Sequence, residues 1–157
     1  MVPADPVLDD LDRRLLVALS EDPRAGVLPL ARSLGVARNT VQARLDRLRQ
    51  RGVITGFGPD IRLEALGWTV LAFVTLEISQ GRIDDVVGHL RDIPEVIEVH
   101  MVTGQGDLHC RVVARTNDHL GAVIAHILEV PGISRTSTVL SLSTPVPARV
   151  LPLVARG

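Results

Sequence analysis

The chain has 157 residues, 46% of them hydrophobic, and a formal net charge of −1 at pH 7. This length holds one ordinary domain or two small ones, and the composition excludes a disordered chain and one that is basic throughout. A single cysteine excludes an internal disulfide and a metal site built from several cysteines. The sequence contains no apolar run long enough to span a membrane and does not begin like a secretion signal. We therefore expect a cytoplasmic protein with no membrane partner.

The first predicted helix follows a leader at residues 1–7. Asp9 or Asp10 is placed to cap this helix, and Asp22, which precedes a proline, is placed to end it. Its apolar residues recur at i, i+4 and i+8, so they share one face: Leu11, Leu15 and Leu19.

Residues 27–54 predict two further helices joined by a short turn. Gly35 is the residue at which a left-handed turn is expected. The second of these helices has an inward stripe at i, i+4 and i+7: Val41, Leu45 and Leu48. After it, residues 52–57 turn and extend in the manner of a short wing. Three helices and a wing predict a winged helix-turn-helix domain over residues 1–60.

The helix that starts near residue 38 is the one concentrated positive zone of the chain. Between positions 38 and 51 it has five arginines and a single acid, Asp46. With small polar side chains opposite the inward stripe, this pattern suits the major groove of double-stranded DNA, although a solvated helix of an ordinary bundle is the alternative. Because arginine mainly neutralises phosphates whereas Asn and Gln read base edges, the expected DNA contacts are Arg38, Asn39, Thr40, Gln42, Arg44, Arg47 and Arg51.

After a linker at residues 61–68, the helical periodicity gives way to alternating strands and helices. The turn at residues 104–107 suits a hairpin, and Asn117 is placed to cap the second helix of this region. The resulting order, βαββαβ, is the ferredoxin-like arrangement, so the fold class is α+β. The expected strands are residues 69–79, 96–103, 108–115 and 133–142, within a domain at residues 69–144 that an extended C-terminal tail follows at residues 145–157.

Two helices can cover only one face of such a sheet. On the strand after Asp107, the other face includes His109, Arg111 and Val113, a set too mixed for a plain solvent face. A partly apolar sheet face usually pairs with something, and we expect it to join a second copy in a two-fold homodimer. Such a dimer would present two recognition helices to two DNA half-sites.

Several motifs resemble those of the Lrp/AsnC (feast/famine) family of transcriptional regulators, over about residues 8–144. The first part of the match is Leu8-Asp9-x-x-Asp12-x-x-Leu15-Leu16-x-x-Leu19, then Asp22-x-Arg24, Leu30-Ala31, and Val41-x-x-Arg44-Leu45-x-x-Leu48-x-x-x-Gly52-Val53-Ile54. The second part is Val102-Thr103-Gly104-x-x-Asp107, which matches the family's effector loop. The resemblance implies a regulator that catalyses no reaction and needs no cofactor. It also implies a dimer, often assembled into an octamer, that binds promoters and senses an amino acid or a related small effector.

The resemblance also implies where the effector binds in the second domain, known in the family as the RAM domain. The lining residues carried over are Met101, Thr103, Gly104, Gly106, Asp107, Thr136 and Thr138. Glycines expose main-chain N–H groups to a carboxylate, and Asp107 can take an ammonium group. The alternative is a hairpin turn that needs glycine for its backbone and an aspartate for its cap. Two positions depart from the family: Ala37 replaces a serine, so that Asn39 would cap a shifted helix start, and Gly106 replaces a common aromatic residue.

Two other functions stay open. Sirohaem decarboxylases are similar in their two-domain layout and use histidine and arginine against a carboxylated tetrapyrrole; His100, His109 and Arg111 are expected near one another on the uncovered sheet face. In such an enzyme the arginine-rich helix would have no purpose. The other alternative is an effector-binding module whose helix-turn-helix is vestigial, which Asp46 favours and the five arginines oppose.

Overall fold

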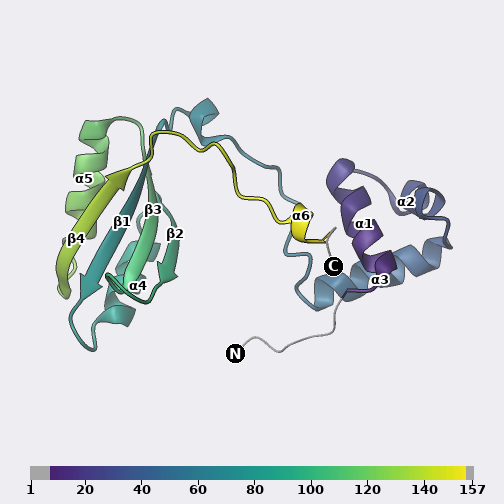
Figure 1. Ribbon diagram of the computed structural model, residues 1–157, viewed down its shortest axis with the longest axis horizontal. Coiled ribbons are helices and arrows are strands. Elements are labelled where there is room, and N and C mark those ends of the chain that lie inside the picture. The colour runs from purple at the N-terminus through teal and green to yellow at the C-terminus, as the bar shows by residue number, and fades with distance from the viewer. Residues whose placement is uncertain (1–7, 155–157) are drawn as a thin grey trace. The chain divides into compact units, whose positions relative to one another are not determined.

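The computed structural model describes residues 8–154 (Figure 1), so the leader expected at residues 1–7 lies outside the described residues. The chain divides into two compact units. The helical unit comprises the residues up to 59 together with those from 146 onward, and the sheet unit comprises residues 60–145. Among the described residues, no helix is long and apolar enough to cross a bilayer.

The helical unit is built on three helices: α1 (Asp10–Glu21), α2 (Val27–Leu34) and α3 (Arg38–Gln50). Asp9 caps α1, and its side chain accepts a hydrogen bond of 2.8 Å from the main-chain N–H of Asp12. Gly35 ends α2 in the left-handed conformation, with φ 69°, and so makes the turn toward α3. The three helices enclose one core: Leu15, Leu19, Leu30, Ala31, Leu34, Val41, Leu45 and Leu48. Leu11, which was expected on the same face as Leu15 and Leu19, is only partly buried and packs against this core.

Two segments of the helical unit differ from expectation. The wing expected at residues 52–57 is a turn followed by an irregular stretch with no strand, because glycines at 52, 56 and 58 weaken any strand there. The C-terminal tail is not extended throughout, since α6 (Leu151–Val154) forms a short turn that contacts α1. There Arg13 donates from Nη1 to the carbonyl of Val154 at 3.2 Å, which gives the end of the tail a fixed partner.

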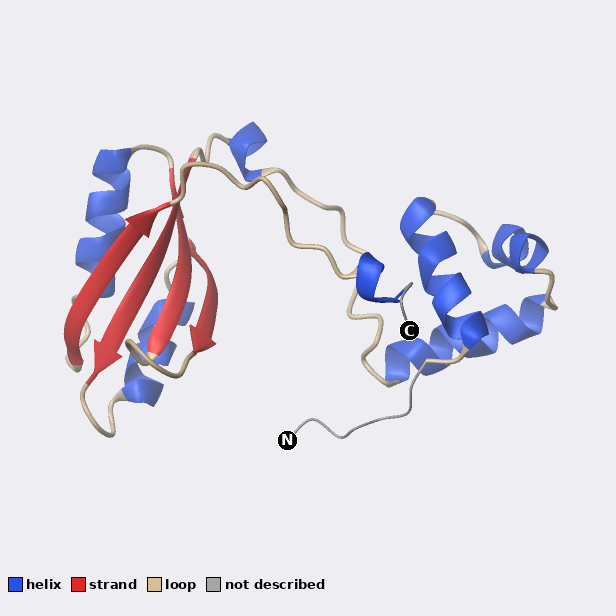
Figure 2. Ribbon diagram, in the orientation of Figure 1, coloured by secondary structure: helices blue, strands red, loops and turns tan. Residues whose placement is uncertain are grey.

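The sheet unit begins with a 3₁₀ turn, η1 (Leu63–Leu66), within the expected linker. Its four strands form one antiparallel sheet in the order β2-β3-β1-β4, and α4 and α5 pack on one face of it (Figure 2). This arrangement confirms the predicted βαββαβ order. The elements are β1 (Val70–Ile78), α4 (Ile83–Arg91), β2 (Val96–Met101), β3 (Leu108–Ala114), α5 (Asn117–Ile127) and β4 (Ile133–Leu140).

The core of the sheet unit lies between the sheet and these two helices. Cys110 is fully buried in this core, and burial raises the pKa of its thiol to about 11. Thr116 and not Asn117 caps α5, because its hydroxyl accepts a hydrogen bond of 3.1 Å from the main-chain N–H of His119. Both side chains are good caps, and the extended backbone at Thr116 decides between them.

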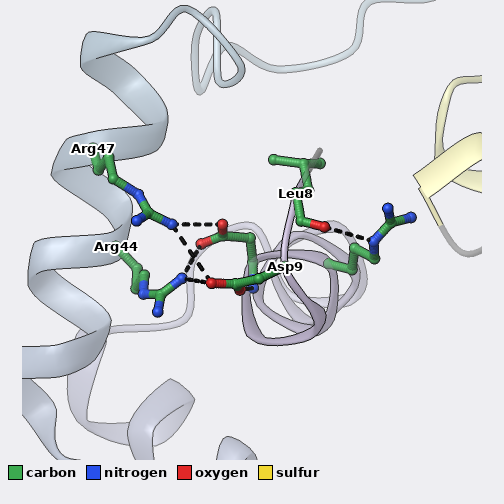
Figure 3. A network of polar contacts seen from close by, with 6 residues as sticks. Leu8, Asp9, Arg44 and Arg47 are labelled. Atoms are coloured by element: carbon green, nitrogen blue, oxygen red, sulfur yellow. Dashed lines mark hydrogen bonds and ion pairs between the residues drawn. The ribbon is translucent and has the colours of Figure 1, made fainter. Parts of the chain in front are cut away.

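Two acids at the start of α1 hold two arginines of α3 (Figure 3). The side chain of Asp12 is 1% exposed and accepts hydrogen bonds from Arg47 Nη2 at 2.7 Å and from Arg44 Nη1 at 3.1 Å. Asp9 also accepts from Arg44, and this hydrogen bond lowers the pKa of Asp9 below its ordinary value of 3.8. The four side chains therefore fix α3 against α1 by charge-assisted bonds.

The first prediction concerns this network. Replacing Asp12 by alanine leaves two arginines without their buried partner, and we expect the free energy of unfolding to fall by about 2–3 kcal/mol. The measurement is urea unfolding followed by far-ultraviolet circular dichroism.

The matched control is Asp10→Ala. Asp10 is in the same helix, 85% of its side chain is exposed, and its ion pair with Arg14 is long, at 3.8 Å. We expect a change of no more than about 0.5 kcal/mol for this variant. Equal losses for the two variants would show that the buried network does not hold α3.

Candidate nucleic-acid interface and ligand cleft

α3 carries the residues expected to contact DNA, but it begins without a capping side chain. Ala37 is its N-cap, so the shifted start at Asn39 does not form. Of the expected base contacts, Asn39 and Gln42 are exposed and Thr40 is partly buried. Arg51 forms the C-cap of the helix. The helix thus starts at Arg38, and no side chain caps its first main-chain N–H groups.

The arginines of α3 do not form one uniform positive surface. Arg44 and Arg47 lean toward the acids of α1, with 26% and 44% of their side chains exposed. The guanidinium carbon of Arg49 lies 4.7 Å from the ring centroid of Phe57. Arg38 is exposed in the first turn, and no salt bridge to it occurs within residues 8–154. The sequence predicted the same role, phosphate contact, for Arg38, Arg44 and Arg47. In the structure Arg44 and Arg47 pair with acids of α1, whereas Arg38 does not.

One acid of α3 is part of a pair that the sequence analysis did not identify. Gln42 donates from Nε2 to both carboxylate oxygens of Asp46, at 3.0 and 3.1 Å. Arg49 lies on the other side, with 4.0 Å between its Nη1 and the same carboxylate. The i, i+4 spacing of Gln42 and Asp46 is the signal in the sequence that could have revealed this pair.

The glycine-rich loop between β2 and β3 borders two adjoining clefts of about 320 and 480 Å³. Four of the expected effector residues line them: Gly104, Gly106, Asp107 and Thr136. Three do not line these clefts: Met101, Thr103 and Thr138. Met101 lies at the end of β2 with 73% of its surface exposed. The expected loop is therefore beside a cleft, but only part of the expected residue set meets there.

The loop is held closely against the end of β1. The Asp107 carboxylate accepts a hydrogen bond of 2.6 Å from the main-chain N–H of Ile78, and the Asp107 N–H donates to the Leu76 carbonyl at 2.8 Å. This aspartate therefore fixes the loop, as the hairpin alternative expected. Gly106 has φ 84°, and a Cβ added to it would collide with the Thr75 methyl group. Glycine at this position is needed for the close approach of the loop to β1.

A pair of opposite charges at this cleft was missed by sequence reasoning. Glu77 on β1 and Arg135 on β4 are cross-strand partners, and both line the 320 Å³ cleft. Arg135 Nη1 lies 3.9 Å from Glu77 Oε1, with 76% and 48% of the side chains exposed. Only the pairing of β1 with β4 brings these residues together, so a scan for local motifs could not find them.

The uncovered face of the sheet is the one opposite α4 and α5. There Glu98 joins the expected basic residues: Arg111 Nη1 lies 2.7 Å from Glu98 Oε2 and His100 Nε2 lies 3.0 Å from Glu98 Oε1. The hydrogen bond from Arg111 lowers the pKa of Glu98. Arg111 is thus already paired with Glu98, whereas a decarboxylase would need this arginine to bind substrate carboxylates. Within the described residues, no group of three or more His, Cys, Asp or Glu side chains is arranged to hold a metal ion.

The helical unit has a larger cleft, of about 630 Å³, lined mainly by α1 and α2. Its two inner arginines already have main-chain partners. Arg13 donates to the carbonyls of Leu8 and Val154, and Arg14 donates to that of Leu34. Because both guanidinium groups are already hydrogen-bonded to main-chain carbonyls, this cleft is less suited to bind an anionic group than the smaller clefts beside the glycine-rich loop.

Two family models match the chain. The AsnC-type helix-turn-helix domain matches residues 8–49, and the Lrp/AsnC ligand binding domain matches residues 71–151. The HTH-type transcriptional regulator FL11 of Pyrococcus horikoshii is 30% identical over 146 residues, which are 93% of this chain and 97% of that protein. Both halves of the chain therefore have known relatives, in the same order.

Solved structures of similar proteins share this architecture. The structure of E. coli AsnC gives a TM-score of 0.88 at 30% identity and covers 94% of this chain and 100% of the AsnC chain. A feast or famine regulatory protein from M. tuberculosis, complexed with L-methionine, gives a TM-score of 0.82 at 31% identity, covering 92% of this chain and 98% of that one. The chain therefore belongs to the Lrp/AsnC family of DNA-binding transcriptional regulators.

Proposed function

We propose that this regulator binds operator DNA through α3 and takes an α-amino acid as its effector in the cleft beside residues 104–107. The observation that carries the effector proposal is the pairing of Glu77 with Arg135 at that cleft. An α-amino acid presents an ammonium group and a carboxylate on neighbouring atoms. A cleft with one acid and one guanidinium a few ångströms apart is complementary to such a zwitterion.

Different residues of the cleft bind different groups of the ligand. Arg135 receives the carboxylate, and Glu77 receives the ammonium group in place of Asp107, whose carboxylate holds the loop. Glycines 104 and 106 line the adjoining cleft with no side chain, so a further ligand oxygen can approach the main chain there. The Thr136 hydroxyl is buried without a hydrogen-bond partner among the described residues, and a bound ligand that reached it would remove the cost of leaving it unsatisfied.

The class of ligand is supported by one relative. The M. tuberculosis regulator that shares 31% identity with this chain has been solved with L-methionine. That complex belongs to the other protein, and it supports an amino acid as the class of effector here. The cleft does not specify which side chain the ligand carries. Its uncharged lining residues are Thr75, Gln105, Gly106, Thr136 and Ser137.

The second prediction tests the cleft by thermal unfolding against a panel of the common α-amino acids. At least one of them, at about 100 times its Kd, should stabilise the wild type by about 2.7 kcal/mol and raise Tm accordingly. Gly106→Ala should lose this shift because the added methyl group collides with Thr75. Arg135→Gln should lose it because the carboxylate has no guanidinium partner.

The control is Gly121→Ala in α5, where an added Cβ meets open space. It should keep the full ligand-dependent shift, each variant being compared with its own ligand-free Tm. The effector proposal is wrong if no amino acid raises the Tm of the wild type, or if Gly106→Ala and Arg135→Gln respond as the wild type does.

DNA binding by α3 depends on which cations remain available for phosphates. Arg38 is exposed and outside the network with α1, so its side chain is available to a phosphate. Arg44 is mainly engaged with Asp9 and Asp12 and acts by placing the helix. We therefore assign Arg38 to phosphate neutralisation and Arg44 to positioning.

The third prediction follows from this difference. The measurement is anisotropy titration of a labelled duplex from upstream of the protein's own gene, at several salt concentrations. The slope of log K against log salt is negative, and Arg38→Ala should make it shallower by about one unit. Arg91→Ala removes the same charge from an exposed position of α4 and should leave the slope unchanged. Equal slopes for wild type and Arg38→Ala would exclude a phosphate contact by Arg38.

We also propose that the uncovered face of the sheet joins two copies of the chain. Phe73 lies at the centre of this face, with Arg111 as its cross-strand partner on one side and Val139 on the other. Val139 is 62% exposed, and the Phe73 ring stacks on His109 at 5.6 Å. A second copy of the same face would cover these apolar groups.

The fourth prediction is that Val139→Arg dissociates the dimer. Because Val139 is already mostly exposed in one chain, the substitution should leave each chain folded while placing two unpaired charges in the contact. Sedimentation equilibrium should give the dimer mass or a multiple of it for the wild type and the monomer mass for the variant. Leu128→Arg, at the C-cap of α5 away from this face, is the control and should keep the wild-type mass. An unchanged mass for Val139→Arg would rule out this face as the contact.

A further inference from the structure

We infer that Asp46 and Gln42 act together as a cytosine-reading pair in the major groove, an inference that rests on the proposed binding of DNA through α3. The hydrogen bonds between these two side chains carry it, together with their place on the helix. The sequence patterns assigned Gln42 to a base edge and counted Asp46 in favour of a vestigial helix-turn-helix. The pairing changes the chemistry of both.

Asp46 lies on the side of α3 that faces away from the core. Successive residues of a helix turn by about 100°, so the residue five positions after Val41 and two before Leu48 lies well away from their buried stripe. Asp46 shares this outward side with Asn39, which is exposed in the first turn. About half of the Asp46 side chain, 49%, is exposed. The carboxylate therefore lies on the surface that α3 would present to a groove.

The hydrogen bonds to Gln42 hold the Asp46 carboxylate in place. Gln42 Nε2 donates to both carboxylate oxygens of Asp46, at 3.0 and 3.1 Å, which lie in nearly the same direction from the nitrogen, so one amide N–H is shared between them. The amide oxygen of Gln42 and the remaining lone pairs of the carboxylate are acceptors. The carboxylate of Asp46 itself presents only acceptors to a partner, while the second amide N–H of Gln42 remains a donor beside it.

The four bases differ in the groups that they present to this carboxylate. In the major groove guanine and thymine present acceptors, and adenine presents a donor beside the acceptor N7. Cytosine presents its N4 amino group as a donor, with no acceptor beside it. The Asp46 carboxylate, which Gln42 holds in place, is therefore complementary to cytosine, whereas guanine and thymine oppose it with acceptors and adenine places the acceptor N7 beside its donor. A phosphate is also repelled, so Asp46 has no use as a backbone contact.

The test is a selection of duplexes from a library with a randomised central segment, followed by sequencing of the bound fraction. Wild type should enrich cytosine at one position of each half-site by about tenfold over the other bases. Asp46→Ala should lose the preference at that position alone. Asp46→Asn, which keeps the size and adds a donor, should move the preference from cytosine to a base with an acceptor.

The control is Glu21→Gln, which removes one exposed negative charge from the same unit away from α3 and should keep the wild-type motif. A motif that is identical for wild type, Asp46→Ala and Asp46→Asn would overturn the cytosine-reading pair and leave DNA binding by α3 intact. Failure of the wild type to enrich any motif would overturn the proposed function together with this inference. Circular dichroism of each variant confirms that the helices are formed.

Discussion

The buried carboxylate of Asp12 is the contact on which the helical unit depends. It lies in α1, it is almost wholly removed from water, and its charge is met by two guanidinium groups from α3. A buried charge is tolerated only when paired, so the orientation of α3 is tied to the presence of both arginines. The same contact takes part of the positive charge of α3 away from DNA. The helix that we propose to bind DNA is therefore held by two arginines that the sequence alone would count among its phosphate contacts.

Periodicity and turn residues were sufficient to predict the three helices, the βαββαβ order and both cores. They failed where the outcome depends on partners distant in sequence or on competing local signals. Glu77 and Arg135 are brought together by the pairing of β1 with β4, and Asp12 meets Arg44 only after three helices have packed. The turn of α6 forms where the tail meets α1, and the cap of α5 was misassigned by one residue because two good caps are adjacent.

The cleft of the sheet unit depends on small side chains more than on charged ones. Gly106 allows the loop to approach Thr75, and Asp107 then anchors the loop through the N–H of Ile78. With the loop held in this way, Glu77 and Arg135 face a common space. They lie on β1 and β4, and the segment before β1 and the segment after β4 are the two by which the sheet unit is joined covalently to the helical unit. The effector that we propose would contact both of these strands.

The burial of Cys110 determines how this protein behaves toward oxidants. With its pKa raised to about 11, the thiol carries almost no thiolate at neutral pH, and the thiolate is the reactive form. Because the chain has no other cysteine, a folded copy offers no group for a disulfide with a second copy. A disulfide between two copies in an oxidising preparation therefore requires chains whose sheet unit has opened to expose Cys110.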